Sequence, residues 1–188
     1  IPEKNNVPAR LQLIRIPSRQ EVASKNLFSV RDATMHWHPD GKFLCVNAMR
    51  MSRTKKTGHV HLEIFRVKEK NCPIESVEIK ETVKMFNWEA GGNRFCILTT
   101  DEAGHNLKAQ FYALGANECK QVAKHDLHAG ISNVFWAPTG QYFVMAAIPG
   151  GDLIFGHLND QNKLDILAKE EHFLMTDVMW DPSSRYVT

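Results

Sequence analysis

The chain has 188 residues, of which 43% are hydrophobic and 23% are charged, a balance that excludes an intrinsically disordered protein. No stretch approaches the ~20 consecutive apolar residues that cross a bilayer, so we expect no membrane contact. The net charge of +2 hides an asymmetry: residues 1–70 carry 14 Lys and Arg against 6 Asp and Glu, whereas residues 71–188 carry 9 against 15. We expect the basic part to face a polyanion or an acidic partner, unless the asymmetry reflects only two differently solvated surfaces.

The start of the chain shows no apolar run of the signal-peptide type and no initiator Met, which predicts a piece of a longer protein. Of the four cysteines, Cys45 and Cys96 lie in apolar runs and are expected to be buried. The absence of CxxC spacing favours a reducing compartment, and we expect no disulfide and no cofactor.

The first predicted elements are strands at 10–16 and 21–30, where many apolar and polar side chains alternate. A hairpin follows: an apolar strand ends at Trp37, the turn reads HPDGK, and Phe43 opens the second strand. Two more strands of this unit are expected at 60–67 and 74–79.

The hairpin phrase then recurs along the chain. Its Trp stands at positions 37, 88, 136 and 180, which are 51, 48 and 44 residues apart. The aromatic that opens the second strand is Phe43, Phe95, Tyr142 or Tyr186, and eight residues past the Trp stands Cys45, Cys96, Val144 or Thr188. Further strands are expected at 108–114, 119–124, 151–158 and 163–168.

A repeat of 40–50 residues with four strands each predicts an all-β fold, a partial WD40-like β-propeller. We expect about three full four-stranded blades plus two half blades, an arc of a larger propeller in which each Trp occupies the same layer of the core. The predicted boundaries within one domain are 1–31, 32–80, 81–126, 127–170 and 171–188. The alternative is a β-sandwich whose hairpins resemble one another by chance.

The runs PARLQLIRIPSRQE, EIFRVKEK and VEIKETV, together with VFWAPTGQYFVMA and MTDVMWDPSSRYV, resemble the B-subunit family of eukaryotic translation initiation factor 3. The resemblance covers the whole chain. It implies the propeller region of a non-enzymatic, cytoplasmic scaffold that docks on the small ribosomal subunit during preinitiation-complex assembly and mRNA scanning. It also implies contacts with ribosomal protein or rRNA and with the a, i and g subunits of the factor, and no small-molecule substrate.

The best candidate for binding is the loop MRMSRTKKTGH at 49–59, which is expected to join the second and third strands of the first full blade. Arg50, Arg53, Lys55 and Lys56 are packed into seven residues and could neutralise phosphates in a salt-dependent way. No aromatic stands among them, so contacts with backbone phosphates or an acidic protein are expected rather than base stacking. The alternative is a solvated loop that keeps the protein soluble.

The sequence offers little chemistry beyond this loop. His36, His38, His59 and His61 could in principle meet across two strands, but no Cys or carboxylate completes a zinc site, and we predict no metal. Glu170, Glu171 and His172 are expected in a loop between blades as solvated charge. No catalytic motif is present, so the remaining alternatives are a generic protein-interaction propeller or the non-catalytic propeller of a larger hydrolase.

Overall fold

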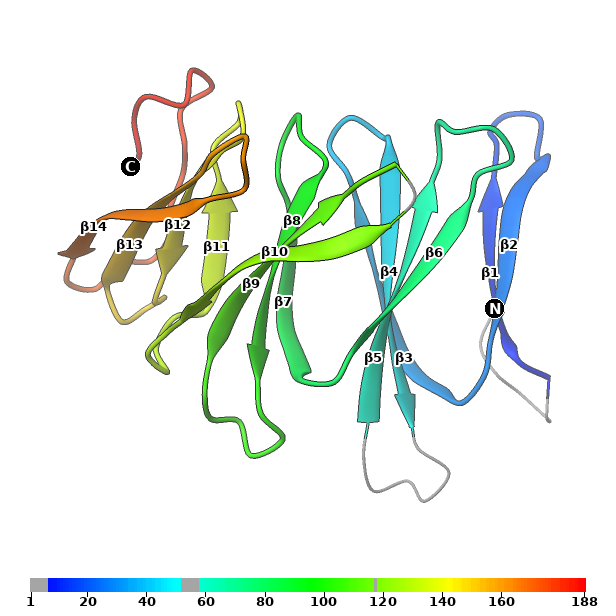
Figure 1. The fold of residues 1–188 in the computed structure, drawn as a ribbon, viewed down its shortest axis with the longest axis horizontal. Helices are drawn as coiled ribbons and strands as arrows, with labels where there is room; N and C mark the ends of the chain where they lie inside the picture. Colours follow the sequence, from blue (N-terminus) through cyan, green and yellow to red (C-terminus); the bar gives the residue numbers. More distant parts are fainter. Residues whose placement is uncertain (1–6, 52–57, 117) are drawn as a thin grey trace. The chain divides into compact units, whose positions relative to one another are not determined.

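The structure is a computed structural model that describes residues 7–51, 58–116 and 118–188. In those ranges every regular element is a β-strand (Figure 1), so the predicted all-β class is confirmed. A membrane-crossing helix is accordingly absent from the described part of the chain. The strands fall into two compact units, one of residues 1–37 and 41–80, the other of residues 38–40 and 81–188.

The first unit contains a two-stranded antiparallel sheet and a four-stranded antiparallel sheet whose strands lie in chain order. The small sheet is formed by β1 (Ala9–Ile14) and β2 (Glu21–Leu27). The larger is formed by β3 (Val30–Trp37), β4 (Phe43–Met51), β5 (Gly58–Arg66) and β6 (Ile74–Ile79). Leu11, Leu13 and Val22 of the small sheet pack against a core that includes Leu44 and Phe65 of the larger one.

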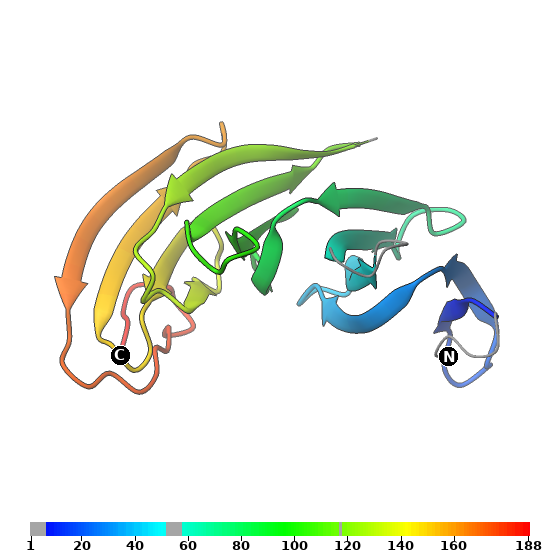
Figure 2. The same ribbon diagram turned by 90° about the horizontal axis from the view of Figure 1, so that it is seen from below.

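The second unit contains two four-stranded antiparallel sheets, again with the strands in chain order. One is β7 (Thr82–Trp88), β8 (Arg94–Thr100), β9 (Lys108–Leu114) and β10 (Cys119–Asp126). The other is β11 (Asn133–Trp136), β12 (Tyr142–Ala146), β13 (Asp152–Leu158) and β14 (Leu164–Glu171). The two sheets lie side by side in both views (Figures 1 and 2).

Aromatic side chains interdigitate between these two sheets. Trp136 of β11 meets Phe111 of β9 edge to face at 5.9 Å between ring centroids, and it meets Phe143 of β12 at 5.2 Å. Phe111 and Phe143 are fully buried in the same cluster. This packing uses the edge-to-face geometry that aromatic rings prefer, and it joins the two sheets in one core cluster.

The repeated phrase forms hairpins as predicted. Trp37, Trp88 and Trp136 each end the first strand of a four-stranded sheet, and Trp180 forms an isolated bridge with Val187. The residue eight positions past each of the first three tryptophans is fully buried; these residues are Cys45, Cys96 and Val144.

Two details of the repeat differ from the prediction. Trp88 and Trp136 are buried, but Trp37 is 52% exposed, so the four tryptophans do not all occupy the same layer of core. The aromatic residue that opens the second strand also differs in position: the register is the same, since Trp88 pairs with Phe95 as Trp136 pairs with Phe143, but Phe143 lies one residue beyond Tyr142. Arg94, rather than Phe95, therefore occupies the position that Phe43 and Tyr142 hold in their hairpins.

Candidate functional site

The predicted basic loop joins β4 to β5, as the sequence indicated, since β4 ends at Met51 and β5 begins at Gly58. Arg50 lies in the last part of β4. Arg53, Lys55 and Lys56 lie outside the described residues. The surroundings of Arg50 are therefore the part of the predicted site that the structure describes.

Arg50 takes part in an ion triad with Lys25 and Glu63. The Glu63 side chain, in the middle of β5, has no exposed surface, and its Oε1 accepts a hydrogen bond of 2.7 Å from Nη2 of Arg50. Nζ of Lys25, in β2, lies 2.5 Å from Oε2 of the same carboxylate. Two cations from different sheets thus neutralise one buried carboxylate, which would otherwise be very costly to remove from water.

The triad directs the guanidinium of Arg50 inward, and only about a quarter of its side chain is exposed. Its Nε is buried without a hydrogen-bond partner in the described part of the chain. Two cations balance one carboxylate, so the triad keeps a net positive charge at the end of β4 that leads into the basic loop. Arg50 can anchor the base of that loop, while its side chain is less available to a phosphate than the sequence suggested.

The four histidines do not gather into one site. His59 lies directly opposite Arg50 in the β4–β5 ladder. Burial, followed by the nearby charge of Arg50, lowers the pKa of His61, and burial lowers the pKa of His36. His38 lies beyond the end of β3, with Nε2 3.1 Å from the carbonyl oxygen of Gly92. Over the described ranges, no three His, Cys, Asp or Glu side chains cluster as metal ligands would.

The prediction that Glu170 and Glu171 lie in a loop is wrong. Both residues belong to β14, where they pair with Leu153 and Asp152 of β13. The ladder continues because β13 offers backbone partners as far as Asp152, and these satisfy groups that a loop would leave to water. Only His172 follows the strand, and its backbone N–H donates to the carbonyl oxygen of Gly151 over 2.8 Å.

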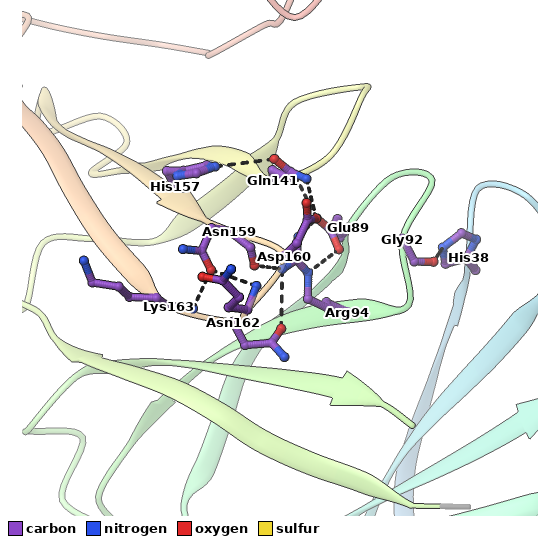
Figure 3. Close-up of polar contacts among 11 residues, drawn as sticks. His38, Glu89, Gly92, Arg94, Gln141, His157, Asn159, Asp160, Asn162 and Lys163 are labelled. Carbon is purple, nitrogen blue, oxygen red and sulfur yellow. Dashed lines mark hydrogen bonds and ion pairs between the residues drawn. The ribbon is translucent and has the colours of Figure 1, made fainter. Parts of the chain in front are cut away.

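The second unit holds a polar cleft that the sequence did not predict (Figure 3). Its centre is a buried ion pair, in which Nε of Arg94 donates to Oε2 of Glu89 over 2.7 Å and Nη2 donates to Oε1 over 2.5 Å. Both side chains are more than nine-tenths buried. This bidentate geometry is the strong form of an arginine–carboxylate pair, and it joins the two ends of the β7–β8 turn.

The same pair reaches the neighbouring sheet. Oε1 of Glu89 accepts the backbone N–H of Gln141 over 2.7 Å, and Nη1 of Arg94 donates to the carbonyl oxygen of Asn159 over 2.6 Å. The Gln141 side chain continues the network by donating from Nε2 to Asp160 over 2.7 Å. These contacts tie three turns together around a cleft of about 480 Å³.

The cleft ties the two sheets of the second unit together. Glu89 and Arg94 neutralise each other's charges, and their further hydrogen bonds go to backbone groups of the adjacent sheet and, from Nη1 of Arg94, to Oδ1 of Asn162 over 3.4 Å. One signal in the sequence could have revealed the pair: an arginine stands where the other hairpins carry an aromatic residue. The corresponding signal for the ion triad was Glu63 itself, a charged residue within an apolar strand.

The comparisons with known proteins agree with the fold and with the motifs. Residues 25–188 match the family model described as eukaryotic translation initiation factor eIF2A. Curated proteins named as the B subunit of eukaryotic translation initiation factor 3 are 38% identical in Bombyx mori, 35% in Drosophila melanogaster and 35% in Mycosarcoma maydis. Each alignment covers 99–100% of this chain but 28% of the relative, so the chain spans just over a quarter of their length.

Solved structures show the fold alone. A crystal structure of a eukaryotic initiation factor superposes with a TM-score of 0.72 at 17% identity, covering the whole chain and 43% of that protein. A protein of unknown function from Desulfotomaculum acetoxidans superposes with a TM-score of 0.59 at 12% identity, over 89% of this chain and 51% of that one. The chain therefore belongs to the family described as eukaryotic translation initiation factor eIF2A, and its whole length is similar to part of the B subunit of eukaryotic translation initiation factor 3.

Proposed function

We propose that this chain is the propeller region of a non-enzymatic scaffold subunit of translation initiation factor 3. It acts in the cytoplasm, where it docks on the small ribosomal subunit during assembly of the preinitiation complex and mRNA scanning. The observation that carries the proposal is the 35–38% identity to the B subunit of that factor, across the whole chain, in insects and a fungus. Contacts with the a, i and g subunits belong to the same proposal.

The order of the strands within each sheet supports the proposed domain organisation. We propose that β3–β6, β7–β10 and β11–β14 are successive blades of one propeller, and that β1 and β2 end the blade before them. In this arrangement the end of β4 and the start of β5 lie on one face of the propeller. We infer that a large anionic particle docks on this face.

The docking element is the basic loop, with Arg53, Lys55 and Lys56 as the phosphate-facing groups. Arg50 contributes as the anchor of the loop through Glu63 and adds to the local positive charge. Contacts of this kind depend on counterion release, so they weaken steeply as salt rises and carry no sequence information.

The test uses the full-length subunit and purified small ribosomal subunits. Arg53, Lys55 and Lys56 are replaced by Ala, and the dissociation constant is measured across a salt series. Arg50 is left in place, because its loss would also disturb the buried Glu63. We expect weaker binding and a salt slope shallower by about two to three, the value for three lost phosphate contacts.

A matched control removes the same charge from the other unit. Lys84, Lys124 and Lys163 are exposed there, and their replacement by Ala is expected to leave affinity and slope unchanged. If the loop variant binds as the control does, the loop is solvated surface and the docking proposal for it fails.

A further inference from the structure

Two turns of the first unit gather at one end of its sheets. The β1–β2 and β5–β6 turns lie at the upper end in Figure 1, as does the start of β4, while β4 ends and β5 begins at the lower end. The backbone N–H of Val67, in the β5–β6 turn, donates to the carbonyl oxygen of Lys42, just before β4, over 2.9 Å. Leu13 and Val22, which flank the β1–β2 turn, pack in the same cluster as Cys72 of the β5–β6 turn.

These turns carry exposed cations. Arg15 and Arg19 lie in the β1–β2 turn, and Lys68 and Lys70 lie in the β5–β6 turn; all four are exposed. We call these four residues the turn surface.

The acidic residues near the turn surface are already engaged. Nη1 of the buried Arg66 donates to Glu69 over 3.2 Å, and its Nη2 donates to Glu75 over 3.2 Å. Arg66 thus pairs with both carboxylates and offsets one of their two negative charges, which leaves the four cations of the turn surface in excess. The side chains that project from this end of the unit are accordingly dominated by positive charge.

We propose that the turn surface binds RNA through backbone phosphates. An RNA backbone fits better than an acidic protein, because protein interfaces are depleted in Lys and rely on aromatic anchors, and the β1–β2 and β5–β6 turns contain no aromatic residue. Because these turns offer no aromatic ring on which a base could stack, we expect the contact to be with phosphates rather than bases. This surface lies at the opposite end of the sheet from the basic loop, so the inference does not rest on the docking role proposed for that loop.

The test measures binding of the full-length subunit to two single-stranded 30-nucleotide RNAs, one of uridine only and one of mixed sequence. Arg15, Arg19, Lys68 and Lys70 are replaced by Ala. For both RNAs we expect at least tenfold weaker binding at low salt and a salt slope shallower by about three. The control variant replaces Lys84, Lys120, Lys124 and Lys163, four exposed lysines of the second unit, and is expected to bind as the unaltered protein does.

A second measurement locates the contact directly. Chemical acetylation of the unaltered subunit should be slowed at Lys68 and Lys70 by bound RNA, and not at Lys84 or Lys124. The proposal is overturned if the turn-surface variant and the control variant lose affinity equally, or if bound RNA leaves Lys68 and Lys70 as reactive as before. It is also overturned if polyglutamate protects these lysines and RNA does not, since the partner is then an acidic protein.

Discussion

The fully buried carboxylate of Glu63 in β5 is held 2.7 Å from the guanidinium of Arg50 in β4, four residues away along the ladder. Nζ of Lys25, in β2 of the other sheet, donates to the same carboxylate. A residue that the sequence offers as a phosphate ligand is therefore first of all a structural cation. The binding role of the loop and the stability of its base are separable.

Replacing Arg50 by Ala is expected to loosen β4 and β5. Glu63 keeps only Lys25, and a buried carboxylate that loses one partner destabilises its surroundings. Because Arg50 is partly exposed, we expect a cost of about 1–3 kcal/mol, below the full value for a buried pair. Amide hydrogen exchange of β4 and β5 peptides in the full-length subunit should then be faster by about tenfold or more.

Arg10 provides the matched control for Arg50. It lies 3.0 Å from Glu21 in the same unit, but both side chains are exposed, and exposed pairs contribute about 0–1 kcal/mol. Exchange in the Arg10→Ala variant should stay close to that of the unaltered protein. Equal effects of the two substitutions would show that burial of Glu63 does not govern the strength of the triad.

The contribution of the Glu89–Arg94 pair to stability can be tested by substitutions that copy the uncharged residues of the next hairpin. Arg94→Ala leaves Glu89 buried with an uncompensated charge, for which we expect a loss of about 3–5 kcal/mol. The double variant Glu89→Ala and Arg94→Tyr copies Ala137 and Tyr142, which hold the same positions in the next hairpin. Thermal unfolding should show a smaller loss for the double variant than for Arg94→Ala. A larger loss would mean that the links to Gln141 and Asn159 matter more than the buried charge.

The strands were predictable because each repeat carries its side-chain alternation in the local sequence. The expected run at 108–114 coincides with β9, and the expected run at 74–79 coincides with β6. The partners of Glu63 were not predictable, because Glu63 meets Lys25 only after two sheets have packed. The place of Arg94 could have been predicted, because Phe95 stands seven residues past Trp88, whereas Tyr142 stands six residues past Trp136.

The two glycines of the β7–β8 turn should differ in their tolerance of a side chain. A Cβ on Gly92 would lie 2.2 Å from Oε2 of Glu89, whose position is fixed by Arg94. A Cβ on Gly91 would meet nothing within 4 Å, but the residue has a φ of +71°, so Ala there costs only backbone strain of about 1 kcal/mol. We expect Gly92→Ala to lower the melting temperature more than Gly91→Ala. The reverse order would show that Glu89 can move aside and that the pair is not rigid.

The turn that follows Trp180 should respond to acid through Asp181. Hydrogen bonds from the Ser183 side chain and then from backbone N–H groups, led by that of Tyr186, lower the pKa of Asp181 to about 2. A carboxyl whose pKa is lower in the folded state stabilises the fold above its unfolded value of about 3.9, and this contribution is lost as pH falls towards 2. The melting temperature of the unaltered subunit should exceed that of Asp181→Asn at pH 5, and the gap should close between pH 4 and pH 2.

Ser183→Ala gives this prediction a graded control. It removes the first of the hydrogen bonds that lower the pKa of Asp181 and leaves the carboxylate in place. The pKa of Asp181 should rise towards its ordinary value, so the stability lost in acid should be smaller and should disappear at a higher pH than in the unaltered protein. A difference in melting temperature between the unaltered protein and Asp181→Asn that stays constant from pH 5 to pH 2 would contradict the assignment, because protonation of the carboxylate must weaken the hydrogen bonds that it accepts.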